Sequence, residues 1–405
     1  LIVLLVLFGC SEEQPKSVKL LRCIDCHTVK ADFHHPMPCI TCHQGKSPAK
    51  DEITAHKELI AGPAHPDNLQ KSCGECHPDI SDQISETLHF TLENSTNLFR
   101  KSFGARVALD SFRETPVSKF PETGLELADD LLRRRCFRCH PYNSGDRYPE
   151  VFHGTGCAAC HLSYENGEME SHVFVKPSDE HCLSCHYGNY VGFDYYGRFE
   201  HDLNVEYRTP YTTKDEFFRP YGVEYHQLSA DIHQQKGMGC MDCHSGQELM
   251  EPDSEKITCE GCHSYDLLES TLPQRVAKHQ GVYILNSRLG KQHIIPLIQH
   301  PSHFNQKEKF SCQTCHALWT YNDIGKHFLR IDSDDADTLA SLSVQGSLEV
   351  ENVIENNSDF DKDEIPVQMT DKISGELSPG IWHRGFTIRR WETITLGRDK
   401  DGKIT

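Results

Sequence analysis

A five-residue pattern, Cys-x-x-Cys-His, occurs nine times in this chain of 405 residues and constrains its fold more than any other feature. The nine copies use eighteen of the nineteen cysteines, whereas the composition alone would give roughly 0.06 copies by chance. We call these copies pentads 1 to 9, in chain order. Their cysteines are Cys23 and Cys26, Cys39 and Cys42, Cys73 and Cys76, Cys136 and Cys139, Cys157 and Cys160, Cys182 and Cys185, Cys240 and Cys243, Cys259 and Cys262, and Cys312 and Cys315. Their histidines are His27, His43, His77, His140, His161, His186, His244, His263 and His316.

The spacing within a pentad indicates one kind of chemistry. Two cysteines three residues apart can form thioether bonds to both vinyl groups of one haem, and the adjacent histidine then lies close enough to ligate the iron. The pattern therefore predicts nine covalently bound haem c groups. A disulfide framework, or zinc sites built from Cys-x-x-Cys pairs, is the main alternative. Neither alternative requires a histidine directly after every second cysteine, so we favour haem.

The composition bounds the fold class. Only 37% of the residues are hydrophobic, and nine ligand clusters leave little sequence for conventional helices and strands. We therefore expect a mainly α-helical or irregular fold, packed around haems, with little regular secondary structure and a small β-rich unit at the C-terminal end. Because haems would supply much of the apolar interior, we expect that the protein without haem does not fold.

The net charge bears on partners. The formal charge is −19 before any haem propionate is counted. A surface this acidic repels nucleic acid and anionic lipid, so nucleic acid is not expected as a partner. It could attract basic partners at long range, or serve solubility alone, and both interpretations stay open.

The first ten residues resemble an export signal. An apolar run over residues 1–8 is followed by Gly9 and Cys10, and it is far shorter than the about 20 residues that span a bilayer. Residues 7–10 are similar to the cleavage box of bacterial lipoproteins, and Cys10 is the one cysteine outside a pentad. We expect a lipid anchor at Cys10 that holds the protein to a membrane. By the same resemblance, Ser11 favours the outer membrane over the inner one. The alternative is an ordinary signal peptide cleaved nearby, which would leave Cys10 as an unmodified thiol. Haem attachment also requires export.

The pentads divide the chain into six expected parts. These are a signal remnant at 1–10, a three-haem region at 11–97, a spacer at 98–133, a second three-haem region at 134–190, an aromatic segment with a third three-haem region at 191–330, and a β-rich tail without haem at 331–405.

Periodicity gives local expectations within these parts. We expect helices at 80–90 and at about 125–135, and strands at 343–350 and 386–394. The aromatic residues at 190–225 are expected to pack inside the protein rather than form a subunit contact. The acidic run at 359–363 is expected to be a solvated loop, because Glu364 and Thr370 stand where a calcium loop of the EF-hand type needs Gly and Glu.

Each haem iron needs a second axial ligand, and histidine is the expected one. Seventeen histidines remain outside the pentads, against only six methionines. Pairs of imidazoles hold haem potentials lower than a Met/His pair does, so we expect low-potential, bis-histidine haems. The nine expected distal ligands are His35, His56, His89, His153, His172, His233, His293, His303 and His327. The reserves are His34, His65, His181, His201, His226, His279 and His300, and the remaining histidine, His383, lies in the tail.

Three longer stretches carry a resemblance to a known family. They are residues 153–161, the stretch from Asp231 to His244, and the stretch from Cys312 through Trp319 to His327. Over about residues 20–330, and more loosely in the tail, the chain resembles the large exported multihaem c-type cytochromes of bacterial respiratory and extracellular electron transfer. That resemblance implies chains of bis-histidine haems that conduct electrons. The resemblance does not fix a partner; we expect other redox proteins, such as other cytochromes or an outer-membrane conduit.

Three functions remain open at this point. The first is electron transfer along the nine haems in the periplasm, at the outer membrane or outside the cell. The second is a multihaem reductase of nitrite, hydroxylamine or a sulfur oxyanion, which needs one iron with an open position. Some related enzymes mark that haem with Lys in place of the pentad histidine, and none of the nine pentads does so. The third is structural, as a subunit of an extracellular cytochrome filament or of a membrane-spanning conduit, and a homo-oligomer or filament is the corresponding expectation for assembly. We favour electron transfer without catalysis.

Overall fold

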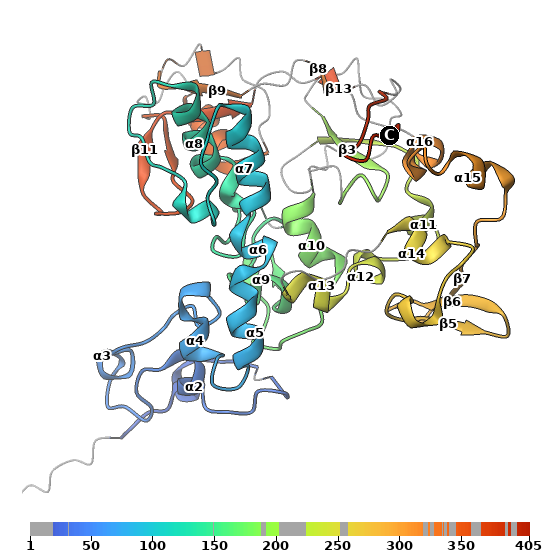
Figure 1. Cartoon of the computed structure of the whole chain (residues 1–405). Coiled ribbons are helices and arrows are strands. Elements are labelled where there is room, and N and C mark those ends of the chain that lie inside the picture. Colours follow the sequence, from blue (N-terminus) through green and yellow to red (C-terminus); the bar gives the residue numbers. More distant parts are fainter. Residues whose placement is uncertain are drawn as a thin grey trace, which may run out of the picture.

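The computed structural model describes residues 19–30, 32–148, 150–187, 192–201, 224–251, 258–318, 323–324, 328–333, 335, 338–339, 346–357, 366–384, 388–389 and 395–405. Figure 1 shows an open arrangement of short elements in three groups. Helices α2 to α4 form the first group, α7 and α8 lie with β9 and β11 in the second, and α11 and α14 to α16 lie with β5 to β7 in the third. Helices α9, α10, α12 and α13 connect them.

The chain begins with short helices, which include the first group and lead from it to the second. They are α1 (Cys23–Cys26), α2 (Cys39–His43), α3 (Glu52–Ala55), α4 (Leu69–Ser72), α5 (Pro78–Gln83) and α6 (Leu88–Thr91). The expectation of one helix over 80–90 was wrong, because α5 passes into a 3-10 turn (Ile84–Glu86) and the chain then breaks at Thr87 before α6. Thr87 has extended backbone angles (φ −72°, ψ 157°), which cannot continue a helix, and its hydroxyl donates to the carbonyl of Ile84.

The second group contains the two longest helices of the N-terminal half. Helix α7 spans Glu93–Ser102, and α8 spans Gly124–Arg134, where the sequence predicts a helix at about 125–135. Thr123 and Glu126 form a capping box at the start of α8, which satisfies backbone N–H groups that have no partner within the helix. The buried carboxylate of Asp129 accepts a hydrogen bond from the buried Arg100 on α7 at 2.7 Å. The two helices are therefore joined by a desolvated ion pair.

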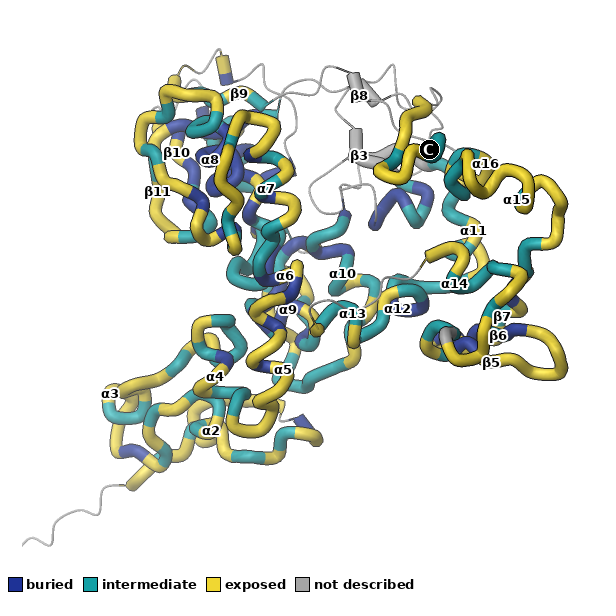
Figure 2. Tube along the Cα trace, in the orientation of Figure 1, coloured by how far each residue is buried: buried dark blue, intermediate teal, exposed yellow. Residues whose placement is uncertain are grey.

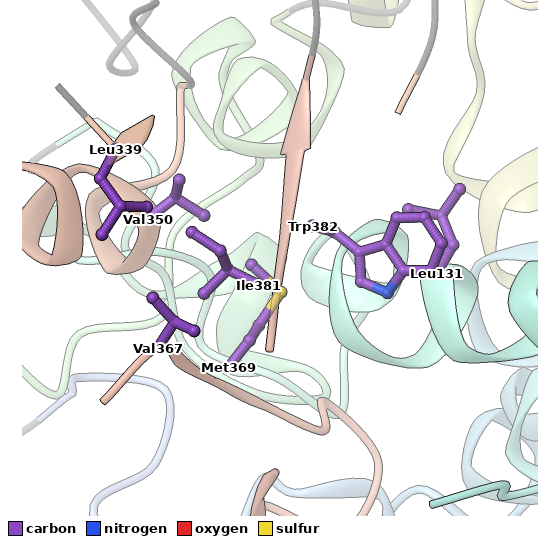
Figure 3. Close-up of a cluster of buried hydrophobic side chains, with 7 residues drawn as sticks. All are labelled: Leu131, Leu339, Val350, Val367, Met369, Ile381 and Trp382. Carbon is purple, nitrogen blue, oxygen red and sulfur yellow. The ribbon is translucent and has the colours of Figure 1, made fainter. Parts of the chain in front are cut away.

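The tail and helix α8 share one hydrophobic core. Strand β9 (Phe328–Ile331) pairs with β12 (Ile381–Arg384), and β10 (Gln368–Thr370) pairs with β11 (Leu377–Pro379), both antiparallel. Asp371 accepts a hydrogen bond from Arg133 at 2.6 Å, and Asp130 accepts one from the Trp382 indole at 2.8 Å. Figure 3 shows the buried side chains of the core, which are Leu131, Leu339, Val350, Val367, Met369, Ile381 and Trp382. Helix α8, which lies almost wholly in the segment 98–133 expected to be a spacer, therefore packs against the tail.

Within the described residues, the tail contains a helix as well as short strands. The strand expected at 343–350 is wrong in its described part, where α18 (Leu348–Asn357) begins. Val350, Val353 and Ile354 recur at helical spacing and contact the tail core, so burial favours the helix. Of the strand expected at 386–394, only β13 (Ile388–Arg389) lies within the described residues, paired with β8 (Asp323–Ile324). The acidic run at 359–363 lies outside the described residues.

The connecting elements and the third group are also short. They are α9 (Ala158–His161), β1 (Tyr164–Glu165), β2 (Glu168–Met169), α10 (Asp179–His186), β3 (Arg198–His201), β4 (Glu224–Gln227), α11 (Ile232–Gln235), α12 (Cys240–Cys243), α13 (Gly246–Met250), α14 (Cys259–His263), β5 (Val276–His279), β6 (Val282–Asn286), β7 (Gln292–Ile294), α15 (Pro301–Gln306) and α16 (Cys312–His316). Strand β6 lies between β5 and β7 in an antiparallel sheet. Isolated helices of this length are not stable in water, so they depend on the groups packed against them.

Burial is distributed unevenly. Figure 2 shows buried residues concentrated around α8, with exposed and half-buried residues dominating α2 to α5. Most of the aromatic segment at 190–225 lies outside the described residues. Its described Tyr195 donates a hydrogen bond to the carbonyl of Met238 at 2.9 Å, and Tyr196 donates one to Asp179. Among the residues that the structure describes, no helix combines the length and apolar character needed to span a membrane.

Candidate haem-binding sites

The pentads fold as helical turns that place both cysteines on one side. Residues three apart in a helix lie on the same face, so the two thiols of a pentad can reach one planar ligand. In pentads 1, 3, 5 and 7 the N–H of the histidine donates to the carbonyl of the first cysteine at 2.8, 2.9, 3.0 and 2.9 Å. Pentads 2, 6, 8 and 9 lie within α2, α10, α14 and α16. Pentad 4 differs, because Cys136–Arg138 forms a 3-10 turn in which Phe137 has non-helical angles.

All eighteen pentad cysteines are free thiols, and none of them is in the buried class. Cysteine is among the residue types most often found fully buried, so this exposure is unusual. In seven pentads one cysteine is exposed and the other half-buried, and in pentads 6 and 7 both are half-buried. Thiols presented in this way are accessible for thioether formation.

Six pentad histidines each face a second histidine. His303 and His316 have ring centroids 6.0 Å apart, and the other five pairs have similar separations. These pairs are His27 with His56 at 5.9 Å, His77 with His35 at 6.3 Å, His43 with His172 at 6.0 Å, His186 with His89 at 6.3 Å, and His263 with His233 at 6.0 Å. All six partners are among the nine histidines expected as distal ligands.

The separation of the facing rings is what a shared metal ion would need. Two metal–nitrogen bonds of about 2.0 Å, together with about 1.1 Å from each nitrogen to its ring centre, span about 6 Å. The six pairs therefore fit axial ligation of one iron from both sides.

Hydrogen bonds at the other ring nitrogen leave Nε2 available for a metal. The Nδ1 atoms of His43, His161 and His263 lie 3.0, 3.0 and 2.8 Å from backbone carbonyl oxygens. A carbonyl can only accept, so Nδ1 must carry the proton and Nε2 has a free lone pair. Among the distal candidates, His35 and His233 donate in the same way to Asp32 and Asp231, at 2.5 and 2.8 Å. Such partners orient a metal-binding histidine and raise its basicity.

Three of the reserve histidines have the opposite arrangement. Nδ1 of His65, His181 and His300 accepts a hydrogen bond from a backbone N–H at 3.1–3.2 Å. Since the backbone group can only donate, neutral rings in this geometry carry their proton on Nε2 and cannot bind a metal there. His65 and His300 are helix caps, each followed by proline at the first helical position. His-Pro before a helix is the sequence signal that could have marked these two as caps.

The remaining candidates are placed as follows. His153 is buried, with Nδ1 2.7 Å from the carbonyl of Gly154 and Nε2 3.5 Å from the Cys185 sulfur. His293 lies on β7, and its Nε2 is buried without a partner. His244 contacts Glu248 through Nδ1 at 3.2 Å. His327 lies outside the described residues, as do Cys10 and the side chains of the reserves His201 and His226. The reserve His34 packs edge-on against Phe33, and the reserve His279 lies on β5.

Burial keeps several of these histidines neutral. It lowers the pKa of His89, His153 and His172, and it lowers the pKa of His140 to about 3. Neutral imidazole is the form that binds metals. His140 is 1% exposed, and its Nε2 has no hydrogen-bond partner. Its Nδ1 accepts a hydrogen bond from the N–H of Tyr142 at 3.1 Å, so the neutral ring carries its proton on Nε2 and offers no lone pair to a metal in this geometry.

Cysteines of different pentads come into contact and link them in a definite order. The thiols of Cys73 and Cys157 lie together against one hydrophobic cluster, and this contact lowers the pKa of Cys73 to about 7. Three further pairs of thiols lie close enough to affect each other's pKa. These are Cys139 with Cys185, Cys240 with Cys182, and Cys312 with Cys259. Pentads distant in sequence are thus neighbours in space.

No family model, curated protein or solved structure matches this chain. Among the described residues, no group of three or more His, Cys, Asp or Glu side chains is arranged to hold a metal ion by itself. Six of the expected distal histidines lie instead opposite pentad histidines.

Proposed function

We propose that this protein is a multihaem c-type cytochrome that transfers electrons along nine covalently bound haems. The observation that carries the proposal is the set of six facing histidine pairs, each joining a pentad to a second histidine at 5.9–6.3 Å. Haem bound at these positions would exchange single electrons by cycling between ferric and ferrous iron. The residues of the chain hold, space and tune these groups.

Contacts between pentads support a continuous path. Pentads 1 and 2 both contact the segment that carries His56 and Ile60. The ring of His56 faces that of His27, and the N–H of Ile60 donates to the carbonyl of His43 at 2.8 Å. Pentads 2 and 3 meet where the Ser72 hydroxyl donates to the carbonyl of Cys42 at 3.1 Å. Pentad 3 then touches pentad 5 through Cys73 and Cys157.

The second half of the path continues in the same manner. Helices α9 and α10, which carry pentads 5 and 6, pack together. Asp179 of α10 accepts a hydrogen bond from the N–H of Cys240 at 2.9 Å, which ties pentad 6 to pentad 7. His233, just before pentad 7, faces His263 of pentad 8. Cys312 of pentad 9 donates to Glu260 of pentad 8 at 3.4 Å.

The groups around the histidines favour low potentials. Carboxylates contact Nδ1 of His35, His233 and His244, and such partners make an imidazole a stronger electron donor to ferric iron. Paired imidazoles already hold the potential below that of a Met/His pair. We therefore propose low-potential haems of the bis-histidine type, which suit electron transfer better than binding of a substrate at iron.

Location and partners follow from the sequence. We propose that the protein is exported to the periplasm or outer membrane and that a lipid at Cys10 anchors it to the membrane. The proposal extends to a position at the cell surface. Redox proteins with a basic docking face, including other cytochromes or an outer-membrane conduit, match the net charge of −19. Nucleic acid does not match that charge.

Electron paramagnetic resonance of the oxidised holoprotein tests this function. Haems with histidine on both sides give low-spin ferric signals. A spectrum dominated by low-spin iron supports electron transfer. A high-spin signal from one haem per protein would indicate an iron with an open position, and it would favour the reductase instead.

A further inference from the structure

Residues 172–175 contact histidines of three candidate haem sites, and we call these four residues the bridging segment. They lie between β2 and α10, in the second expected three-haem region at 134–190. Two of the sites that they reach, those of pentads 2 and 3, belong to the first expected region at 11–97. The third site is that of pentad 5. The bridging segment therefore joins haem sites that lie far apart in the sequence.

The first contact is made by His172. Its ring faces that of His43 in pentad 2, with 6.0 Å between the centroids. Nδ1 of His43 donates to the carbonyl of Ile60 at 3.0 Å, so its Nε2 keeps a free lone pair. Burial lowers the pKa of His172, which keeps that ring in the neutral form that binds metals. The bridging segment thus carries the histidine that faces pentad 2.

The second contact is made by Phe174, which is half-buried. Its ring packs on that of His35, with 5.0 Å between the centroids. His35 in turn faces His77 of pentad 3 at 6.3 Å. Nδ1 of His35 donates to the buried Asp32 at 2.5 Å, which leaves Nε2 free for a metal. Phe174 therefore packs against the distal ligand expected at pentad 3, two residues after the one expected at pentad 2.

The third contact anchors the bridging segment to pentad 5. The N–H of Val175 donates to the carbonyl of His161 at 2.8 Å, and Nδ1 of His161 donates to the carbonyl of Val175 at 3.0 Å. Two hydrogen bonds to one residue fix the backbone at this end of the segment. They also orient the His161 ring with its Nε2 free.

The three contacts are too close together to move independently. Three peptide units span at most about 10 Å, so residues 172 and 175 cannot be farther apart than that. Val175 is held by backbone hydrogen bonds, whereas the described contacts of His172 and Phe174 are made by their rings. The packing of Phe174 on His35 is therefore the contact that fixes the middle of the segment.

We infer that Phe174 is a positioning residue that couples two distal ligands, His35 at pentad 3 and His172 at pentad 2. This inference rests on the proposed function. A distal histidine binds iron tightly only if the surrounding groups hold it at the required distance, and a site that is about 1 Å too loose loses that advantage. The ring of Phe174 supports His35 directly and His172 through the backbone. Losing this ring should weaken both ligands, although they belong to different parts of the chain.

Carbon monoxide titration of the reduced holoprotein, followed by haem absorbance, tests the inference. Carbon monoxide competes with the distal histidine for ferrous iron, so its apparent affinity rises as the histidine is held less well. In F174A two haems should bind carbon monoxide about tenfold more tightly, the size of effect expected when a group that supports a metal ligand is lost. F174Y keeps the ring and should behave as the unchanged protein does. F103A is the matched control, because it removes a ring that packs at 5.1 Å on Phe99 rather than on a histidine.

Double variants identify the two haems. H172A and H35A should each open one iron to carbon monoxide without competition. Adding F174A to H172A should raise the affinity of one further haem, that of pentad 3. Adding F174A to H35A should do the same for the haem of pentad 2. An effect of F174A on one haem only would show that the two ligands are not coupled, and it would overturn the inference.

The remaining outcomes are also decisive. Equal effects of F174A and F103A, or of F174A and F174Y, would show that the ring of Phe174 does not position these ligands. If F174A does not fold, F174L replaces it, because it keeps apolar volume without the ring and should give a smaller rise at the same two haems. Intact mass counts the haems in each sample. Nine haems with unchanged carbon monoxide affinity would overturn the inference alone, whereas fewer than nine in the unchanged protein would overturn the proposed function as well.

Discussion

The imidazole rings of His303 and His316 are parallel, with an angle of 5° between their planes and 6.0 Å between their centroids. His303 lies on α15 and His316 ends α16, so a short stretch of chain brings both rings to one position. Nδ1 of His303 lies 3.2 Å from the carbonyl of His300, which leaves its Nε2 free. This pair is the simplest case of the arrangement repeated at five other pentads.

Replacing His303 should expose one iron. In H303A the distal ligand of the pentad 9 haem is lost, and we expect one high-spin ferric haem per protein by electron paramagnetic resonance. H300A is the matched control, because His300 lies nearby but its Nδ1 caps α15 through the N–H of Ser302. It should cost about 1 kcal/mol of stability and leave the spin state unchanged. A high-spin signal in H300A and none in H303A would reverse the assignment.

Asp231, which is hydrogen-bonded to His233, should lower the reduction potential of the haem that His233 is proposed to ligate. Asp231 accepts from Nδ1 of His233 at 2.8 Å and also caps α11. D231N keeps a capping oxygen but weakens the acceptor, so ligand affinity should fall about tenfold and the potential of that haem should rise. D51N removes the same charge from the cap of α3. Potentiometry should show one shifted component in D231N and none in D51N, and equal shifts in both would contradict this role.

Removing one haem site from the middle of the proposed path should interrupt electron flow. Pentad 7 contacts pentad 6 through Asp179 and precedes pentad 8, so C240A/C243A, which cannot attach haem at pentad 7, should lower electron flow into the third group at least tenfold. The control C23A/C26A cannot attach haem at pentad 1, at one end of the proposed path, and should retain most of the flow from pentad 3 onward. Stopped-flow reduction of the haems in the third group measures both. Equal loss in the two variants would contradict this order of pentads.

Acid should weaken the holoprotein before its carboxyl groups titrate. Burial lowers the pKa of His89, His153 and His140 below the ordinary value of 6.5. Below about pH 6.5 the unfolded chain takes up protons that the folded one does not, so each such histidine costs up to about 1.4 kcal/mol per pH unit until its folded pKa is reached. Melting temperatures should fall between about pH 6.5 and 4. A constant melting temperature over that range would contradict burial of these rings.

The tail should contribute to the stability of α8. Ile381 is fully buried against the core that contains Leu131. I381A should therefore lower the free energy of unfolding by about 2–5 kcal/mol. The matched control is L377A, on the neighbouring strand β11, where the side chain is 64% exposed. Thermal unfolding of the holoproteins measures both. A loss in L377A as large as that in I381A would mean that the tail core is not placed as described.

The sequence predicts those features that depend on residues close together in the chain. The pentad spacing predicts a helical turn with both thiols on one face. Seven pentads coincide with α-helices, and pentad 3 forms a turn between α4 and α5 that is closed by a hydrogen bond from the N–H of His77 to the carbonyl of Cys73. The amphipathic pattern near 125–135 predicts α8, because its capping box and apolar positions are all close in sequence. Local histidine pairs such as His303 and His316 could be proposed from proximity alone.

Long-range relationships could not be predicted in this way. His172 faces His43, and His89 faces His186, across long stretches of chain that no periodicity relates. The packing of Ile381 on α8 was missed for the same reason. The strand expected at 343–350 failed because Val350, Val353 and Ile354 fit a helical face as well, and the tail core selects that face.

The most direct test is the intact mass of the protein purified from a host that attaches haem c, measured together with a free-thiol assay. The account predicts nine covalently bound haems and no reactive thiol among the eighteen pentad cysteines. Fewer than nine haems, with a matching number of free pentad thiols or disulfides, would contradict it.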